Sequence, residues 1–123
     1  MSNDCTGAEV IPPCEIDRGG EASLFMALGD EKRLRMLDIV AVNPGICACT
    51  LIKAFDMSQS TLSHHMSLLR KAGLVMCEKR GRWSHYTLSD DGFRKAIAYC
   101  NGMTGAQETA RLQATQPHSC SAD

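Results

Sequence analysis

The chain has 123 residues, a formal net charge of −1 and 44% hydrophobic residues. This length suits one domain and excludes multi-domain enzymes and large barrels, while the apolar fraction is enough for a packed core. No apolar run approaches the roughly 18 residues that a membrane span requires, and the first residues lack the basic and apolar regions of a secretory signal. We therefore expect a protein that stays in the cytoplasm.

Cysteine is frequent for a chain of this size. The seven cysteines are Cys5, Cys14, Cys47, Cys49, Cys77, Cys100 and Cys120. In a reducing cytoplasm such an excess indicates metal binding or redox chemistry rather than a disulfide framework, and the odd number agrees with that interpretation.

Charge is distributed unevenly along the chain. Residues 1–52 carry 4 basic and 8 acidic side chains, whereas residues 53–95 carry 8 basic and 4 acidic side chains. The basic middle segment suits a surface that faces phosphate groups, although an ordinary solvated face has a similar composition.

The chain begins with a predicted flexible arm and continues into four short helices. Residues 1–20 contain Pro12-Pro13 and Gly19-Gly20 and show little periodicity. The helices are expected at residues 21–28, 31–41, 46–55 and 59–71. Asp30 is an N-cap for the second helix, whose inner face should hold Leu34, Leu37 and either Val40 or Ala41.

The helix predicted over residues 59–71 has two contrasting faces. Its apolar stripe, with the spacing i, i+3, i+4, i+7, consists of Leu62, His65, Met66 and Leu69. The opposite face is polar and basic and contains no acidic residue: Ser60, Ser63, His64, Ser67 and Lys71. Because a purely solubilising face normally includes Glu, this face is typical of one that binds an anionic surface.

Two strands are predicted next, over residues 74–79 and 83–88, joined at the hairpin turn Arg80-Gly81-Arg82. A last helix follows, and we expect residues 105–123 to form a disordered tail. These limits give a flexible, cysteine-bearing arm at residues 1–20 and one domain at residues 21–104.

Together these elements predict a winged helix-turn-helix, mainly α-helical with a small β-hairpin. The second helix of the pair would enter the major groove of DNA, and the hairpin would contact the flanking backbone. The candidate DNA-binding residues are Gln59, Ser60, Thr61, Ser63, His64, Lys71, Arg80 and Arg82. We find no acid–base constellation and no phosphate-binding loop, and we predict that the protein is not an enzyme.

Three segments strongly resemble the ArsR/SmtB family of metal-responsive transcriptional repressors. They are ALGDEKRLRML at residues 27–37, SQSTLSHHMSLLRKAGLV at residues 58–75 and KRGRWSHYTL at residues 79–88. The resemblance covers about residues 21–100. It implies a homodimer paired through its first and last helices, and an operator DNA with an imperfect palindrome that is released when an inducer binds.

The segment Ile46-Cys47-Ala48-Cys49-Thr50-Leu51 resembles the Leu-Cys-Val-Cys-Asp-Leu box of the family's arsenite and cadmium sensors. Positions i and i+2 of a regular helix lie about 200° apart, so two such thiolates do not readily hold one ion. We therefore expect binding by Cys47 and Cys49 to distort the first turn of the helix predicted over 46–55. That distortion would disturb the recognition helix packed against it.

The third ligand is less clearly marked. The simplest arsenite sensors of the family have a third cysteine three residues after the pair, where this chain has Ile52. We favour Cys14 of the arm as the third sulfur, then Cys5, then Cys100. The resemblance to the family's cadmium and lead sensors implies an arm that reaches across to the partner subunit.

The number of thiolates bears on which ion is the inducer. Soft thiolate ligands select soft ions, and three of them neutralise trivalent arsenic or antimony, whereas four around cadmium or lead leave a net negative charge. Pro12-Pro13 separates Cys5 from Cys14, so we favour arsenite or antimonite over cadmium or lead. A repressor triggered by thiol oxidation and a metal-storage protein are the alternatives.

Overall fold

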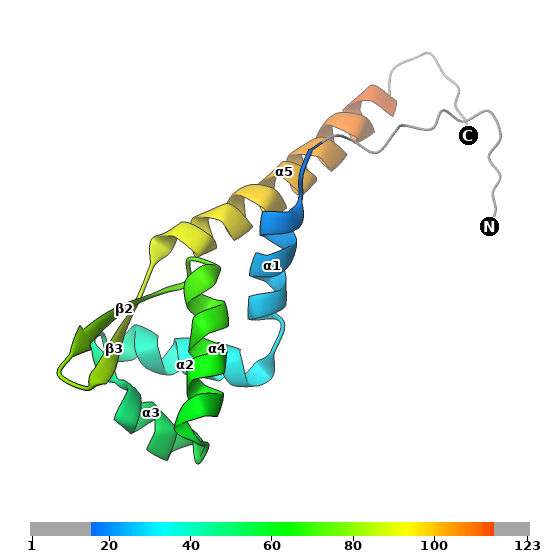
Figure 1. The fold of residues 1–123 in the computed structure, drawn as a ribbon. Helices are drawn as coiled ribbons and strands as arrows, with labels where there is room; N and C mark the ends of the chain where they lie inside the picture. The colour runs from blue at the N-terminus through cyan, green and yellow to red at the C-terminus, as the bar shows by residue number, and fades with distance from the viewer. Residues whose placement is uncertain (1–15, 115–123) are drawn as a thin grey trace, which may run out of the picture.

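A computed structural model describes residues 16–114, in which helices surround one side of a small sheet and the last helix extends away from the body (Figure 1). The helices are α1 (Gly19–Leu28), α2 (Glu31–Val42), α3 (Ala48–Phe55), α4 (Gln59–Lys71) and α5 (Asp90–Ala114). The strands are β1 (Ile46–Cys47), β2 (Val75–Arg80) and β3 (Trp83–Leu88). This order is that of a winged helix-turn-helix, so the predicted fold class is confirmed.

The predicted caps position the helix-turn-helix. The Asp30 carboxylate accepts a hydrogen bond from the Arg33 backbone N–H at 3.1 Å, and the Ser58 hydroxyl accepts one from the Thr61 N–H at the same distance. Between α3 and α4, Asp56 adopts a left-handed conformation with φ of 50°, which reverses the chain within three residues. These contacts fix where α4 begins and the angle at which it leaves α3.

The core lies between α2, α3, α4 and the sheet. Its most deeply buried side chains include Met36, Leu51, Leu62, Met66, Leu69 and Leu74. The predicted inner face of α2 was partly wrong, because Leu34 is 45% exposed while Met36 is fully buried beside Leu37 and Val40. The helix is rotated from the expected orientation because it packs against both α4 and β3.

Arg33 joins three helices at the back of α4. Its Nε donates to the Ala27 carbonyl at 2.8 Å, and its Nη1 lies 3.1 Å from Nδ1 of His65. Because a guanidinium only donates, the His65 Nδ1 is the acceptor. Burial first, and then the Arg33 charge, lower the pKa of His65, so this half-buried histidine is neutral and fixes α4 to the end of α1.

The third helix begins later than expected. Ile46 and Cys47 pair with Tyr86 and His85 of β3 in an antiparallel ladder, which gives the sheet order β1-β3-β2. The prediction of helix from residue 46 was therefore wrong for these two residues. Backbone hydrogen bonding to a distant strand outweighs the local preference there, and α3 begins at Ala48.

The last helix is longer than expected. It continues through Ala114, so residues 105–114 of the predicted disordered tail are helical, and residues 115–123 lie outside the described part. The added turns are rich in Ala, Gln, Glu, Arg and Leu, which are strong helix formers, and Gly105 alone does not interrupt them. None of the helices within residues 16–114 is long and apolar enough to cross a membrane.

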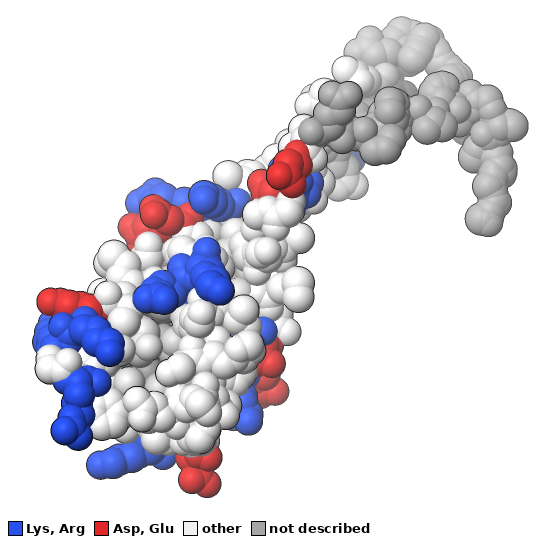
Figure 2. Space-filling model, viewed as in Figure 1, with Lys and Arg blue, Asp and Glu red and all other residues white. Residues whose placement is uncertain are grey.

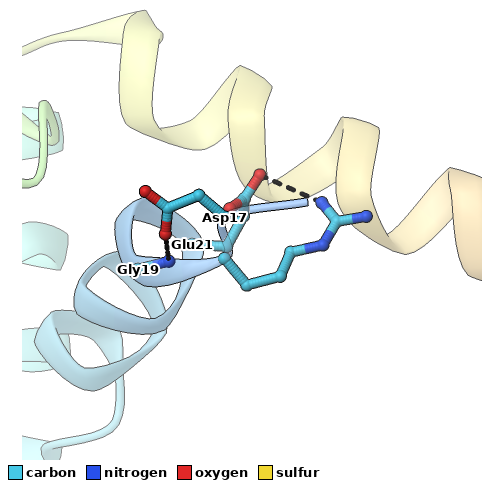
Figure 3. A network of polar contacts seen from close by, with 4 residues as sticks. Asp17, Gly19 and Glu21 are labelled. Atoms are coloured by element: carbon cyan, nitrogen blue, oxygen red, sulfur yellow. Dashed lines mark hydrogen bonds and ion pairs between the residues drawn. The ribbon is translucent and has the colours of Figure 1, made fainter. Parts of the chain in front are cut away.

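The first helix starts at Gly19 against the side of α5. The Asp17 carboxylate accepts the Gly19 N–H at 2.8 Å, and Arg18 pairs with Glu21 at 3.2 Å (Figure 3). The Arg18 guanidinium also lies 5.1 Å from the ring centre of Tyr99 on α5. These contacts hold the point where the N-terminal arm joins the domain. The arm's first 15 residues, with Cys5 and Cys14, lie outside the described part.

The start of α5 is pressed onto the turn that follows α4. The Gly92 N–H donates to the Gly73 carbonyl at 2.8 Å, and a Cβ at Gly92 would lie 2.5 Å from the Ala72 carbonyl oxygen and 2.9 Å from a methyl carbon of Leu74. Only glycine fits at this crossing without a shift of backbone.

We expect Gly92→Ala to lower the free energy of unfolding by about 1–3 kcal/mol, because the new methyl group meets backbone that must move. The matched control is Gly102→Ala in the same helix, where nothing lies within 4 Å of the added Cβ. That change should raise stability by roughly 0.5–1 kcal/mol. Urea unfolding followed by circular dichroism measures both, and an unaltered midpoint for Gly92→Ala would contradict the close approach.

Candidate thiol site and DNA-binding surface

Cys47 and Cys49 form a close pair at the junction of β1 and α3. Their Sγ atoms lie 2.7 Å apart, and the Cys47 sulfur accepts a hydrogen bond from the Cys49 backbone N–H at 3.3 Å. Cys47 has φ of −76° and ψ of 140°, so it is extended and acts as the N-cap of α3. Both side chains are partly exposed and both are free thiols.

This geometry corrects the expected mode of ion binding. Both cysteines were expected in one helix, but Cys47 precedes α3 and its sulfur already faces that of Cys49. The pair can therefore bond to one ion without unwinding the first turn of α3. The β1–β3 ladder is the physical reason, because it holds the Cys47 backbone in the extended conformation.

The electrostatics of the pair favour a thiolate. The side-chain hydrogen bond between the two cysteines is the first cause of the lowered pKa of Cys49. Thr50 and the positive charge of Lys53 act in the same direction, while burial opposes them. The thiolate is the form that binds soft metal ions, so the pair is prepared for that chemistry.

The other described cysteines do not complete the site. Cys77 is half-buried on β2 opposite Tyr86, and Cys100 is exposed on α5. Within residues 16–114, no group of three or more His, Cys, Asp or Glu side chains is arranged to hold a metal ion. This part of the chain thus supplies two adjacent sulfurs, and Cys100 does not join them.

The predicted DNA-binding residues all lie on the surface of α4 and the hairpin. They are Gln59, Ser60, Thr61, Ser63, His64, Lys71, Arg80 and Arg82, and each is exposed. The Thr61 hydroxyl accepts a hydrogen bond from Ser58 at 2.9 Å, so it shares in the cap of α4 while its own proton stays available. His64 points away from the core, in contrast to the half-buried His65.

A groove of about 450 Å³ separates α4 from the hairpin. Gln59, Ser63 and Arg82 line it, together with two cations that sequence reasoning did not select, Arg70 and Lys79. Arg70 could have been selected from the sequence, because it follows Ser63 by seven residues and so shares its face of the helix. Figure 2 shows basic side chains over the hairpin and over the end of α4.

The structure sets Lys71 apart from this groove. Lys71 lies in a second groove of about 500 Å³ between α1, α4 and α5, together with Glu21 and Lys95. On the hairpin, Arg80 pairs with Glu78 at 3.2 Å, an exposed contact that phosphate can readily displace. Arg82 has no ion-pair partner within the described residues, so its charge is available to an anion.

Comparison with known proteins identifies the family. The pattern of the bacterial regulatory protein arsR family matches residues 30–76. An uncharacterised HTH-type transcriptional regulator of Methanocaldococcus jannaschii is 40% identical over 76 residues, which cover 62% of this chain and 85% of that protein. The chain belongs to the ArsR family of transcriptional regulators. The helix-turn-helix, exposed and bordered by basic residues, is its DNA-binding element.

Two further relatives carry names that refer to metal or metalloid resistance. The arsenical resistance operon repressor of Escherichia coli is 42% identical over 54% of this chain and 56% of its own length. The cadmium resistance regulatory protein CadC homolog of Staphylococcus aureus is 28% identical over 62% of this chain and 63% of its own length. The chain thus spans a little over half the length of these two relatives.

A solved structure supports the same fold. The ArsR-like transcriptional regulator from Rhodococcus sp. RHA1 superimposes with a TM-score of 0.64 at 29% identity, over 79% of this chain and 87% of that one.

We expect Arg70→Ala and Arg82→Ala to weaken DNA binding for all sequences alike and to reduce the slope of log affinity against log salt by about 0.9 each. The reason is that each cation lines the groove beside α4 and would release one phosphate counterion. Arg111→Ala, on the distant part of α5, is the control and should leave the slope unchanged. Salt titrations by fluorescence anisotropy measure these slopes. Wild-type slopes for both groove variants would show that the groove does not face the backbone.

Proposed function

We propose that this ArsR-family regulator is a repressor that leaves its operator DNA when arsenite or antimonite binds Cys47, Cys49 and a third thiolate. The observation that carries this proposal is the pair of sulfurs 2.7 Å apart, with the pKa of Cys49 lowered, at the end of the helix that packs against the recognition helix. The arsenical resistance repressors among its relatives support the choice of ion.

Cys14 is the third ligand that we favour, ahead of Cys5 and Cys100. Cys14 precedes Arg18, which lies over Tyr99 of α5, by four positions, and four extended residues span at most about 14 Å. The start of α1 and the helix α3 lie at opposite ends of the domain (Figure 1). We therefore infer that Cys14 meets the cysteine pair of a second subunit rather than that of its own subunit.

A homodimer paired through α1 and α5 accommodates this arrangement. Exposed apolar side chains on these helices include Met26 at 73%, Ile97 at 58% and Met103 at 48%. Large exposed apolar residues on two neighbouring helices favour association of identical subunits. Such a dimer has two recognition helices related by a twofold axis, which suits an operator with an imperfect palindrome. We propose that it acts in the cytoplasm.

A cadmium or lead sensor is the second candidate. The likeness to a cadmium resistance regulatory protein supports it, and the arm offers Cys5 in addition to Cys14. A thiol-redox trigger is the third, but a disulfide between Cys47 and Cys49 would be strained, so oxidation would have to join cysteines far apart in the sequence.

We expect Cys47→Ser and Cys49→Ser each to abolish release by arsenite while leaving operator affinity within about threefold of wild type, because only the ligand sulfur changes. The matched control is Cys77→Ser, since this half-buried cysteine belongs to no group of potential ligands in the described part. Anisotropy of labelled operator DNA during an arsenite titration provides the measurement. Full release from either single variant would exclude the pair as the site.

Mixed dimers test the origin of the third sulfur. We expect Cys14→Ser subunits and Cys47→Ser/Cys49→Ser subunits to be inactive as inducer-binding homodimers. When they are mixed, each heterodimer has one complete site if Cys14 acts across the interface. Such a heterodimer should bind about half as much arsenite as a wild-type dimer. No recovery on mixing would place the third ligand within the same subunit or at another residue.

A further inference from the structure

We propose that ion binding at the cysteine pair reaches the DNA chiefly through the hairpin, and that His85 is the residue that couples the two. This inference rests on the proposed function and adds the route by which the inducer acts. Its basis is that Cys47 is at once a proposed ligand, the N-cap of α3 and the cross-strand partner of His85 on β3.

His85 joins β1 to the hairpin twice. Its backbone faces Cys47 in the β1–β3 ladder, and its Nδ1 lies 3.1 Å from the Gly45 carbonyl oxygen. Because a carbonyl only accepts, Nδ1 carries the proton of this hydrogen bond. A further backbone bond, from the Gly45 N–H to the Tyr86 carbonyl at 2.9 Å, completes the junction. These hydrogen bonds connect the segment that bears Cys47 directly to the hairpin.

Ion binding at the cysteine pair changes the geometry of this junction. An ion bonded to both sulfurs redirects the Cys47 sulfur, which in the free protein accepts the Cys49 N–H as the cap of α3. Cys49 lies within the first turn of α3 and cannot shift alone, whereas Cys47 is held by a strand of two residues. The adjustment is therefore taken up at Cys47, and the β1–β3 pairing changes with it.

The hairpin carries such a change to the DNA-binding surface. β2 and β3 pair continuously from Val75 opposite Leu88 to Arg80 opposite Trp83, so they move as one unit. Arg82 stands in the turn between them, next to Trp83. A small rotation of β3 where it meets β1 therefore moves the tip of the hairpin, where Arg82 lies.

The alternative route through α4 meets more resistance. Leu62, Met66 and Leu69 of α4 are at most 1% exposed, and Arg33 fixes His65 to the end of α1. Close-packed interiors resist displacement, whereas elements with exposed side chains move at low cost. The outer half of the hairpin is exposed from Glu78 to Arg82, so it is the part of the DNA-binding surface that can yield.

Two substitutions at His85 separate coupling from ligation. His85→Asn keeps an N–H donor near the position of Nδ1, whereas His85→Ala removes it. Thr87→Val is the matched control, because Thr87 lies on the same face of β3 but pairs with Met76 of β2. For each protein we would measure operator affinity without and with saturating arsenite, and arsenite affinity in the absence of DNA.

Wild type, His85→Asn and Thr87→Val should show the same arsenite-induced fall in operator affinity. His85→Ala should bind arsenite as wild type does, and bind DNA normally without it, yet show a fall at least about fivefold smaller, as expected for the loss of one linking hydrogen bond. A full fall in His85→Ala would overturn the coupling while leaving the inducer site intact. Loss of arsenite affinity in both His85 variants would overturn it by making His85 a ligand.

The chain's single tryptophan gives a reading that needs no substitution. Trp83 begins β3 at the tip of the hairpin, so its emission reports on the hairpin. One arsenite per cysteine pair should change that emission in wild type, and the change should be reduced in His85→Ala. Stoichiometric arsenite binding with unaltered Trp83 emission in wild type would contradict the proposal. Failure of wild type to bind arsenite at all would instead refute the proposed function.

Discussion

The arrangement of the thiol site depends on the pairing of β1 with β3. Two residues of strand are enough to hold Cys47 extended, and an extended Cys47 does three things at once. It caps α3 with its sulfur, it brings that sulfur to the sulfur of Cys49, and it ties both to the hairpin. Had the helix begun at Ile46, the two cysteines would face away from each other and the site would require unfolding to bind an ion.

The DNA-binding surface combines a rigid element with a yielding one. α4 is fixed by its cap at Ser58, by its buried leucines and methionine, and by Arg33 behind it. The inner part of the hairpin is fixed by β1 and by the buried side chains of Val75 and Tyr86, whereas residues 78–82 are exposed. A regulator needs both, because base recognition requires a helix held at a set angle, whereas response to an inducer requires a part that changes position at small cost.

The sequence was informative where local chemistry decides the structure. The caps at Asp30 and Ser58, the buried stripe of α4 and the hairpin turn at Gly81 were all predicted, because each follows from side-chain spacing or from a residue suited to its backbone conformation. The family was also evident from contiguous segments. The exposed polar face of α4 was predicted for the same reason, since helical periodicity alone assigns it.

The features that the sequence did not predict depend on contacts between segments that are far apart in the chain. The residues around Ile46 and Cys47 favour a helix, but these two residues pair with a strand some forty residues later in the chain. No local sequence pattern predicts that pairing. Arg70 and Lys79 gained importance only when α4 and β2 were seen to border one groove. Leu34 was placed inside by periodicity, but tertiary packing against two elements rotated α2 and buried Met36 instead.

The measurement that tests the account most directly uses the wild-type, reduced, metal-free protein bound to labelled DNA from upstream of its own gene. Arsenite, antimonite, cadmium and peroxide would be titrated separately while anisotropy is followed. The account predicts release by arsenite or antimonite at about one ion for each Cys47–Cys49 pair. Release by peroxide alone, or no binding of DNA under any condition, would contradict it.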